Sequence, residues 1–130
     1  MNRRADKIQA LINKGVTIPA PDSVEIGEEV EIDNISGSSV HIHAGSRIYG
    51  RSTFIADGVV IGGEGPATII SSQAGPSVHL GAGFFEEAVF FPGARAGTNT
   101  HARTGTILEE NASVAHTVGI KQTILFPFVT

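Results

Sequence analysis

The plan of this chain is clearest in residues 107–130, which read ILEENASVAHTVGIKQTILFPFVT. Apolar side chains recur there every six residues, at Leu108, Val114, Ile120 and Phe126. A second series follows each of them by four places: Ala112, Val118, Ile124 and Thr130. A period of six fits neither an α-helix, which repeats every 3.6 residues, nor a single strand, which repeats every two. It fits a solenoid in which each turn contains three short strands, as in hexapeptide repeats.

The same period runs back through most of the chain. The apolar residues on the same multiple of six are Ile18, Val24, Val30, Ile42, Ile48, Phe54 and Val60. We expect these side chains to stack into one continuous inner column, with about 18 residues in each coil. The prediction is an all-β solenoid whose stability comes from apolar side chains stacked between coils.

Composition agrees with a narrow, turn-rich core in a single domain. The 130 residues include 16 Gly, 6 Pro and no Trp. The absence of Cys excludes disulfides and thiolate zinc sites, which suits a cytoplasmic location. The net charge of -4 comes without a stripe of Lys and Arg, so we expect no nucleic-acid partner. No apolar run is long enough to cross a membrane, so we expect a soluble protein with no membrane partner.

Residues 1–15 are expected to form a short N-terminal helix. The apolar residues of one helical face are Ala5, Ile8, Leu11 and Ile12. Asn2 is a candidate N-cap and Gly15 a candidate C-terminal stop. Such a short helix needs an apolar surface to pack on, because it is marginal in isolation. It could cover the open end of the solenoid, or it could be a linker from an upstream domain.

Residues 16–130 are expected to form the solenoid, with one interruption. The segment 62–79, GGEGPATIISSQAGPSVH, breaks the period with Gly-Pro pairs and a Ser-Gln tract. It is interpreted as a loop excursion that contains a short strand, Ala67 to Ile70. Such a loop could carry function, or it could be a plain insertion.

Four of the seven Phe residues are clustered in LGAGFFEEAVFFPG, at Phe84, Phe85, Phe90 and Phe91. Successive residues of a strand point to opposite sides, so some of these rings must face outward. They could pack under the N-terminal helix. They could also form a subunit interface, because large exposed apolar patches are rare on soluble monomers.

The histidines are the residues to test for metal binding. His41 and His43 are two apart on a strand and share a face, but a third ligand is not evident. His79, His101 and His116 invite comparison with the γ-class carbonic anhydrases, hexapeptide trimers that bind zinc through three His. In those enzymes the last two ligands are five residues apart, whereas the residue five places after His116 is Lys121, a cation. No metal site is therefore expected.

Arg103 and Lys121 are the candidate ligand-binding residues. They are 18 residues apart, which is one coil, so their side chains would stack on adjacent strands of one wall. Two cations about 5 Å apart, the spacing of neighbouring strands, would form a phosphate clamp. The alternative is a pair of ordinary solvated cations.

Two segments carry a family resemblance. The run from the N-terminal helix through GVTI and VEIGEEVEI, and the segment ARTGTILEENASVAHTVGIKQTIL, resemble the bifunctional N-acetylglucosamine-1-phosphate uridyltransferase/glucosamine-1-phosphate acetyltransferases and related sugar-1-phosphate nucleotidyltransferases. The resemblance implies a left-handed parallel β-helix that assembles as a homotrimer, with clefts between subunits. It implies acetyl-CoA as the donor of the complete family. It also assigns Arg103 and Lys121 to the phosphate and sugar of the acceptor.

The chain departs from that family in its catalytic parts. Nothing corresponds to the uridyltransferase domain, and the family's catalytic His, with the Tyr, Asn and Lys that follow it, lies downstream of the Lys121 motif and beyond Thr130. We therefore assign no catalytic residue and no cofactor to this chain, and expect it to bind a phosphorylated hexosamine or nucleotide sugar without turnover. The alternatives are a non-catalytic trimerisation module and, more distantly, a γ-carbonic anhydrase-like metalloenzyme.

Overall fold

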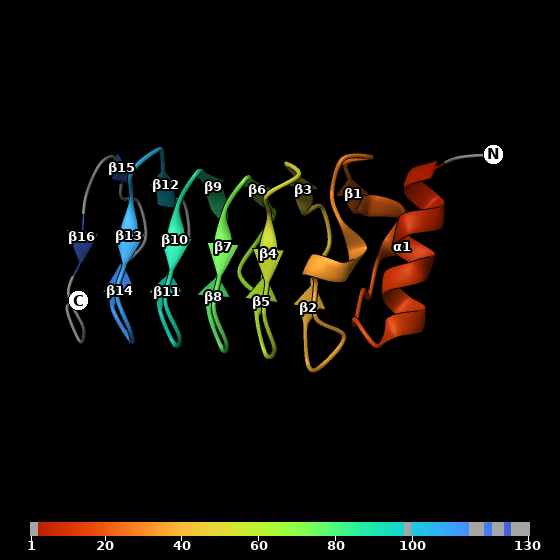
Figure 1. The fold of residues 1–130 in the computed structure, drawn as a ribbon, viewed down its shortest axis with the longest axis horizontal. Helices are drawn as coiled ribbons and strands as arrows, with labels where there is room; N and C mark the ends of the chain where they lie inside the picture. Colours follow the sequence, from red (N-terminus) through yellow and green to blue (C-terminus); the bar gives the residue numbers. More distant parts are fainter. Residues whose placement is uncertain (1–2, 98–99, 115–118, 121–123, 126–130) are drawn as a thin grey trace.

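The computed structural model describes residues 3–97, 100–114, 119–120 and 124–125, and it shows a solenoid of short strands with one N-terminal helix (Figure 1). The helix is α1 (Arg3–Lys14), and two 3-10 turns, η1 (Pro21–Ser23) and η2 (Ile32–Asn34), lie in the first coil. The strands are β1 (Glu25–Ile26), β2 (His41–Ile42), β3 (Arg47–Tyr49), β4 (Phe54–Ile55), β5 (Val60–Ile61), β6 (Ala67–Ile70), β7 (Gln73–Ala74), β8 (His79–Leu80), β9 (Gly83–Glu86), β10 (Val89–Phe90), β11 (Arg95–Ala96), β12 (Thr100–Ala102), β13 (Ile107–Leu108), β14 (Ser113–Val114), β15 (Gly119–Ile120) and β16 (Ile124–Leu125).

The strands form three parallel sheets, which we call walls. Wall 1 has the order β1-β3-β6-β9-β12-β15, wall 2 the order β4-β7-β10-β13-β16, and wall 3 the order β2-β5-β8-β11-β14. Every third strand along the chain therefore returns to the same wall, which is the connectivity of a coil with three strands per turn. Two single bridges, Thr17 with His41 and Ile35 with Ile55, extend walls 3 and 2 toward the helix. The predicted β-solenoid is confirmed.

The core is a narrow column of inward side chains, one from the centre or end of each strand. Most of it is aliphatic, and its largest members are Phe85 and Phe90. Their rings meet edge to face, with centroids 5.7 Å apart and planes at 78°. Such pairs add about 0.5–1.5 kcal/mol beyond the burial of their area. The inward residues of the three walls are Ile26, Ile48, Ile69, Phe85 and Ala102 on wall 1, Ile55, Ala74, Phe90 and Leu108 on wall 2, and Ile42, Ile61, Leu80, Ala96 and Val114 on wall 3.

The predicted inner column is wrong at Phe54 and Val60. Phe54 is 46 % exposed and Val60 is only partly buried, while their neighbours Ile55 and Ile61 point inward. The cause is one additional residue in the turn between β3 and β4, where the Thr53 hydroxyl donates a hydrogen bond to the carbonyl of Tyr49 at 2.6 Å. A shift of one residue exchanges the two faces of a strand, because side chains alternate along it.

The coils also differ in length, so a strict period of six holds for only part of the chain. Residues paired between adjacent coils are 21 apart for Arg47 and Thr68, but only 16 apart for Thr68 and Phe84. The expected 18-residue coil is found near the C-terminal end, where Arg95 pairs with Ser113. Longer and shorter turns compensate for each other, which returns the later coils to the original register.

The expected loop excursion at 62–79 is mostly regular solenoid. The strand Ala67–Ile70 is present as predicted, and it pairs with β3 and β9. β7 also lies in this segment, and Ala74 and Val78 are buried. The Gly, Pro and Ser residues that suggested a loop occupy the corners between strands. Only residues 62–66 leave the repeat, as a short turn that lies over the next coil.

Corners stack as regularly as strands. The residue two places before each wall-3 strand has positive φ, from the first coil to the last one described: Ser39, Gly58, Ser77, Gly93 and Asn111. The backbone N–H of Ser77 donates to the carbonyl of Asp57, and that of Gly93 donates to Pro76, so the corners are hydrogen-bonded from coil to coil. This local geometry bends the chain at each change of wall.

Helix α1 covers the N-terminal end of the coil stack (Figure 1). It packs on β1 and η2, with Leu11 fully buried and Ile12 partly buried. Lys7 Nζ donates to the carbonyl of Val30 at 2.7 Å, and Lys14 Nζ to that of Ile32 at 2.9 Å. The expected end cover is confirmed, while the candidate cap Asn2 lies outside the described residues.

The helix ends where the sequence predicts. Gly15 has φ +121, and its N–H donates to the carbonyl of Leu11. The clustered Phe residues do not pack under the helix, because β9 and β10 lie several coils away from it (Figure 1). Phe85 and Phe90 point inward instead, Phe84 is partly buried, and Phe91 is 41 % exposed.

Candidate functional site

Arg103 immediately follows β12 on wall 1, and its side chain is exposed. Lys121, the other half of the predicted phosphate clamp, lies outside the described residues. The residues directly before these two are paired, Ala102 with Ile120, on the adjacent strands β12 and β15. The structure therefore shows the expected one-coil spacing for the neighbours of the two cations, and the clamp itself stays a prediction.

Arg103 belongs to a mixed patch on the outer surface of wall 1. His101 precedes it by two residues and is exposed like it, while Ala102 between them is buried. The His101 ring stacks on Phe84 of β9, with centroids 6.3 Å apart and planes at 28°. Glu86 follows Phe85, the pairing partner of Ala102, so it lies one coil from Arg103. We call Phe84, Glu86, His101 and Arg103 the wall-1 patch.

The wall-1 patch combines three kinds of recognition within one small area. The stacked rings of Phe84 and His101 offer a flat apolar surface to a sugar or a base. The Glu86 carboxylate is a hydrogen-bond acceptor for hydroxyl groups. The Arg103 guanidinium can hold a phosphate through two parallel hydrogen bonds. Sequence reasoning found Arg103 but missed Phe84, Glu86 and His101, because their positions depend on coils of unequal length.

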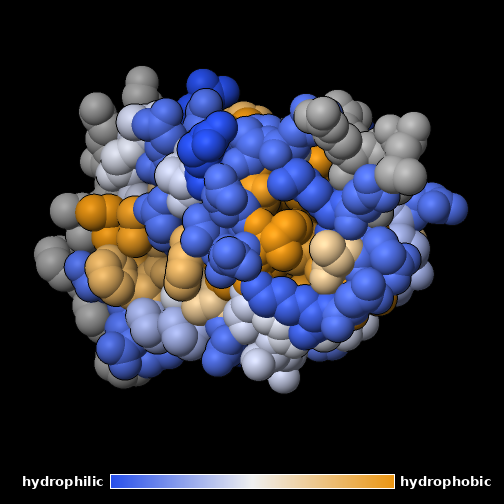
Figure 2. Space-filling model, turned by 45° about the vertical axis from the view of Figure 1, so that its right-hand side comes forward, coloured by the Kyte–Doolittle hydropathy of each residue, from blue (hydrophilic) through white to orange (hydrophobic). Residues whose placement is uncertain are grey.

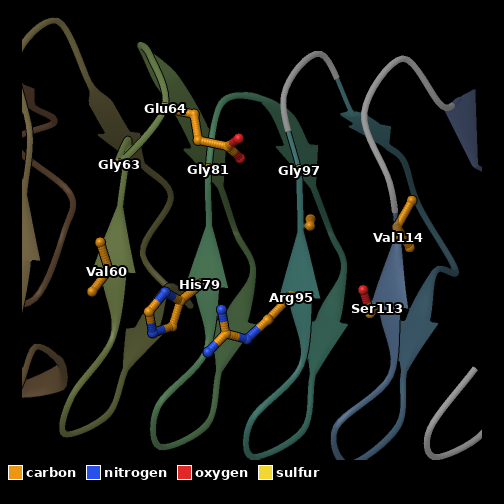
Figure 3. Close-up of a pocket in the computed structure, with 10 residues that line it drawn as sticks. Val60, Gly63, Glu64, His79, Gly81, Arg95, Gly97, Ser113 and Val114 are labelled. Atoms are coloured by element: carbon orange, nitrogen blue, oxygen red, sulfur yellow. The ribbon is translucent and has the colours of Figure 1, made fainter. Parts of the chain in front are cut away.

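A groove of about 390 Å³ lies on wall 3 (Figure 3). Its wall is the outward column Val60, His79, Arg95 and Ser113, from the adjacent strands β5, β8, β11 and β14. Its rim is the turn that contains Gly63 and Glu64. Sequence reasoning missed this groove. His79 and Arg95 are in register although they are only 16 residues apart, which a fixed 18-residue coil does not predict.

The rim of the groove is fixed by backbone hydrogen bonds. The N–H groups of Glu64 and Gly65 both donate to the carbonyl of Gly81, at 2.9 Å and 3.2 Å. The Glu64 carboxylate lies over Gly81, where a Cβ atom would collide with it. Small residues at Gly81, Ala96 and Gly97 keep the floor low, which leaves the groove open beside the rim.

The His79 ring is held in its neutral form. Burial lowers the pKa of the imidazole below its usual value, and the neighbouring Arg95 guanidinium lowers this pKa further. Figure 3 shows the Arg95 side chain extending toward the His79 ring. A neutral imidazole presents one donor and one acceptor, so the groove contains a donor-rich cation next to a ring that can both give and accept hydrogen bonds.

The histidines are spread over more than one wall. His41 and His43 stack with ring centroids 6.2 Å apart. His79 lies on wall 3 and His101 on wall 1, so the two imidazoles do not converge, and His116 lies outside the described residues. Among the residues that the structure describes, no group of three or more His, Cys, Asp or Glu side chains could hold a metal ion.

Fold and site together define a parallel β-helix protein with polar ligand-binding surfaces on two walls. Comparisons with known proteins add no closer relative: no family model, no curated protein and no solved structure matches this chain. Among the helices described, none is both long and apolar enough to cross a membrane.

Proposed function

We propose that this chain is a β-helix module of sugar-phosphate or sugar-nucleotide metabolism, and that it binds a phosphorylated hexosamine or a nucleotide sugar on the wall-1 patch. The observation that carries the proposal is the position of Arg103 beside the stacked rings of Phe84 and His101. Lys121 completes the phosphate grip. The resemblance to the acetyltransferase/uridyltransferase family, whose left-handed β-helices assemble as trimers, supports the same assignment.

The chemistry of the wall-1 patch matches the parts of such a ligand. The apolar face of a pyranose ring packs on Phe84 and His101, as sugars do on aromatic surfaces. Glu86 accepts hydrogen bonds from ring hydroxyls or from the amine. The phosphate lies against Arg103, where a charge-assisted pair contributes about 1.5–3 kcal/mol.

Binding without acetyl transfer is the activity proposed for residues 1–130. Acetyl transfer to an amine needs a general base that removes its proton. The family resemblance places that base, a His, downstream of the Lys121 motif. Acetyl-CoA would be the donor in a complete enzyme, and this chain supplies the acceptor surface. The cytoplasm, where acetyl-CoA and sugar nucleotides are made, is the proposed location.

Calorimetric titration tests the proposal with glucosamine-1-phosphate and UDP-N-acetylglucosamine. Arg103→Ala is expected to weaken binding about 10- to 100-fold, as the loss of a charge-assisted pair implies. Phe84→Ala is expected to weaken it by less. Arg47→Ala is the matched control, because Arg47 is also an exposed Arg of wall 1, on β3. Equal losses in Arg103→Ala and Arg47→Ala would contradict the proposal.

A second function, a trimerisation module, is favoured by a different observation. Phe54 and Phe91 are the large apolar residues that the described part of the chain leaves exposed. Phe54 belongs to the outward column of wall 2, which continues through Gln73 to the partly buried Val89 and Ile107. Figure 2 shows apolar side chains gathered in patches on the face that it displays. A homotrimer that buries wall 2 would remove this surface from water.

A further inference from the structure

We propose that the wall-3 groove is a second ligand site, for a small molecule that carries an anionic group, phosphate or carboxylate, at one end and an amine at the other. Arg95 and Ser113 hold the anion, His79 donates to it or accepts from a neighbouring hydroxyl, and Glu64 receives the amine. This site lies on a different wall from the wall-1 patch and does not depend on the function proposed there.

Register brings the polar groups of the groove together. His79 pairs with Arg95, and Arg95 with Ser113, so the three residues occupy adjacent strands in one outward column. Neighbouring strands are about 5 Å apart, so all three side chains can contact one ligand. Val60 continues the column on the other side of His79 and closes that end with an apolar surface.

Arg95 has a charge that this part of the structure does not neutralise. Among the described residues, no carboxylate lies within salt-bridge distance of its guanidinium. Its nearest titratable neighbour on wall 3 is His79, which is neutral because burial and Arg95 itself lower the pKa of the ring. A guanidinium with free donors in a partly enclosed groove is a receptor for phosphate or carboxylate.

Glu64 makes the groove bipolar. Its backbone is fixed over Gly81, and its carboxylate is held at the rim instead of extending into solvent (Figure 3). A ligand with anionic charge at both ends would be repelled there. A ligand with an amine or ammonium at that end is attracted to the carboxylate. A volume of about 390 Å³ suits a molecule larger than a free phosphate ion and close in size to a substituted monosaccharide.

Titrations with four probes test the site and identify the anion. Glucosamine 6-phosphate supplies the phosphate source, glucosaminic acid the carboxylate source, glucose 6-phosphate lacks the amine, and inorganic phosphate lacks the sugar. We expect one of the two amine-bearing probes to bind at least ten times more tightly than inorganic phosphate. Arg95→Gln should weaken that probe about tenfold or more, and Glu64→Gln should abolish the preference for glucosamine 6-phosphate over glucose 6-phosphate.

Controls separate this groove from the wall-1 patch and from general charge effects. Arg47→Gln and Arg103→Ala should leave the affinity unchanged, and melting followed by circular dichroism shows whether each variant is folded. The His79 ring provides a local readout by NMR titration, because an anion on Arg95 should raise the pKa of that imidazole. The other charged group facing the ring is Glu64, whereas Val60 on β5 does not titrate.

Three results would overturn the inference. The first is that none of the probes binds more tightly than inorganic phosphate. The second is that Arg47→Gln or Arg103→Ala weakens binding as much as Arg95→Gln does. The third is an unchanged pKa of His79 at saturating ligand, which would place the bound molecule elsewhere.

Discussion

Single residues at the corners hold the coils at their pitch. Gly83 shows why: its φ of +134 is open to glycine, and a Cβ atom there would collide with the backbone of Thr100 on the next coil. Gly63 lies at a corner without this constraint, because its nearest neighbour to such an atom is a side-chain carbon of Val60 at 3.4 Å. The two glycines therefore differ in what a methyl group would do to the fold.

Gly83→Ala should lower the free energy of unfolding by about 1–3 kcal/mol or more, because it adds backbone strain to a collision with backbone atoms. Gly63→Ala should change it by less than about 1 kcal/mol. Urea denaturation of both variants measures the difference. A Gly83→Ala protein as stable as Gly63→Ala would show that neighbouring coils adjust without cost.

The stability of the protein should depend on pH through His79. The pKa of this ring is lower in the folded protein than in the unfolded chain, so the unfolded chain binds more protons as the pH falls. Stability is therefore complete above the ordinary pKa of about 6.5 and is lost as the pH falls through and below that value. Arg95, which contributes to the shift, remains charged throughout.

Denaturation midpoints at pH 7.5 and pH 5.5 test this linkage. Wild type is expected to lose more stability between the two values than His79→Gln, whose amide does not titrate. Equal losses would assign the pH dependence to other groups.

At the scale of elements, helix α1 closes the end of the core. Leu11 is fully buried against the first coil, and two lysines of the helix donate to carbonyls of that coil. An uncovered end would expose the edges of the sheets and the apolar column between them. The helix thus acts on stability through one apolar contact face and two polar anchors.

Leu11→Ala should reduce the free energy of unfolding by about 2–5 kcal/mol, because it leaves a cavity at the end of the core. Gln9→Ala, on the exposed face of the same helix, removes only a hydrogen bond to Asn13 and serves as the control. Thermal melts compare the two. A small effect of Leu11→Ala would mean that the first coil closes without the helix.

The strands show where the prediction succeeded and where it failed. The alternation of Ala67 to Ile70 was enough to predict β6, because a half-buried strand repeats every two residues. Phe54 was placed inside because it falls on the sixth residue, yet it points outward. One residue added to a turn cannot be detected from a period when Phe54 and Ile55 are both apolar.

At the scale of the whole molecule, wall 2 is the surface most in need of a partner. Its outward column includes the exposed Phe54, and Phe91 follows β10 on the same wall. If a homotrimer buries this wall, the mass in solution should be three times that of the 13.5 kDa chain. Phe91→Ser combined with Phe54→Ser should then shift the protein toward monomer, because exposed apolar area drives association.

Sedimentation equilibrium measures this mass over a range of concentrations. Thr68→Ser, a change to a partly buried residue of wall 1, is the control and should leave the assembly intact. A monomeric wild type would remove the trimerisation module as a function of this chain.

The repeat of apolar residues, together with the Gly and Pro content, was sufficient to predict a β-solenoid with a helix at its start, because coils of this kind are built from local contacts that recur along the chain. Arg103 could also be identified in advance, since its partner position is one coil later. The walls on which other side chains meet could not. Coils of 16 and 21 residues alter the register, and that register decides that Arg95 lies beside His79 and that His101 stacks on Phe84. Those neighbours come from accumulated turn lengths, which only the folded chain reveals.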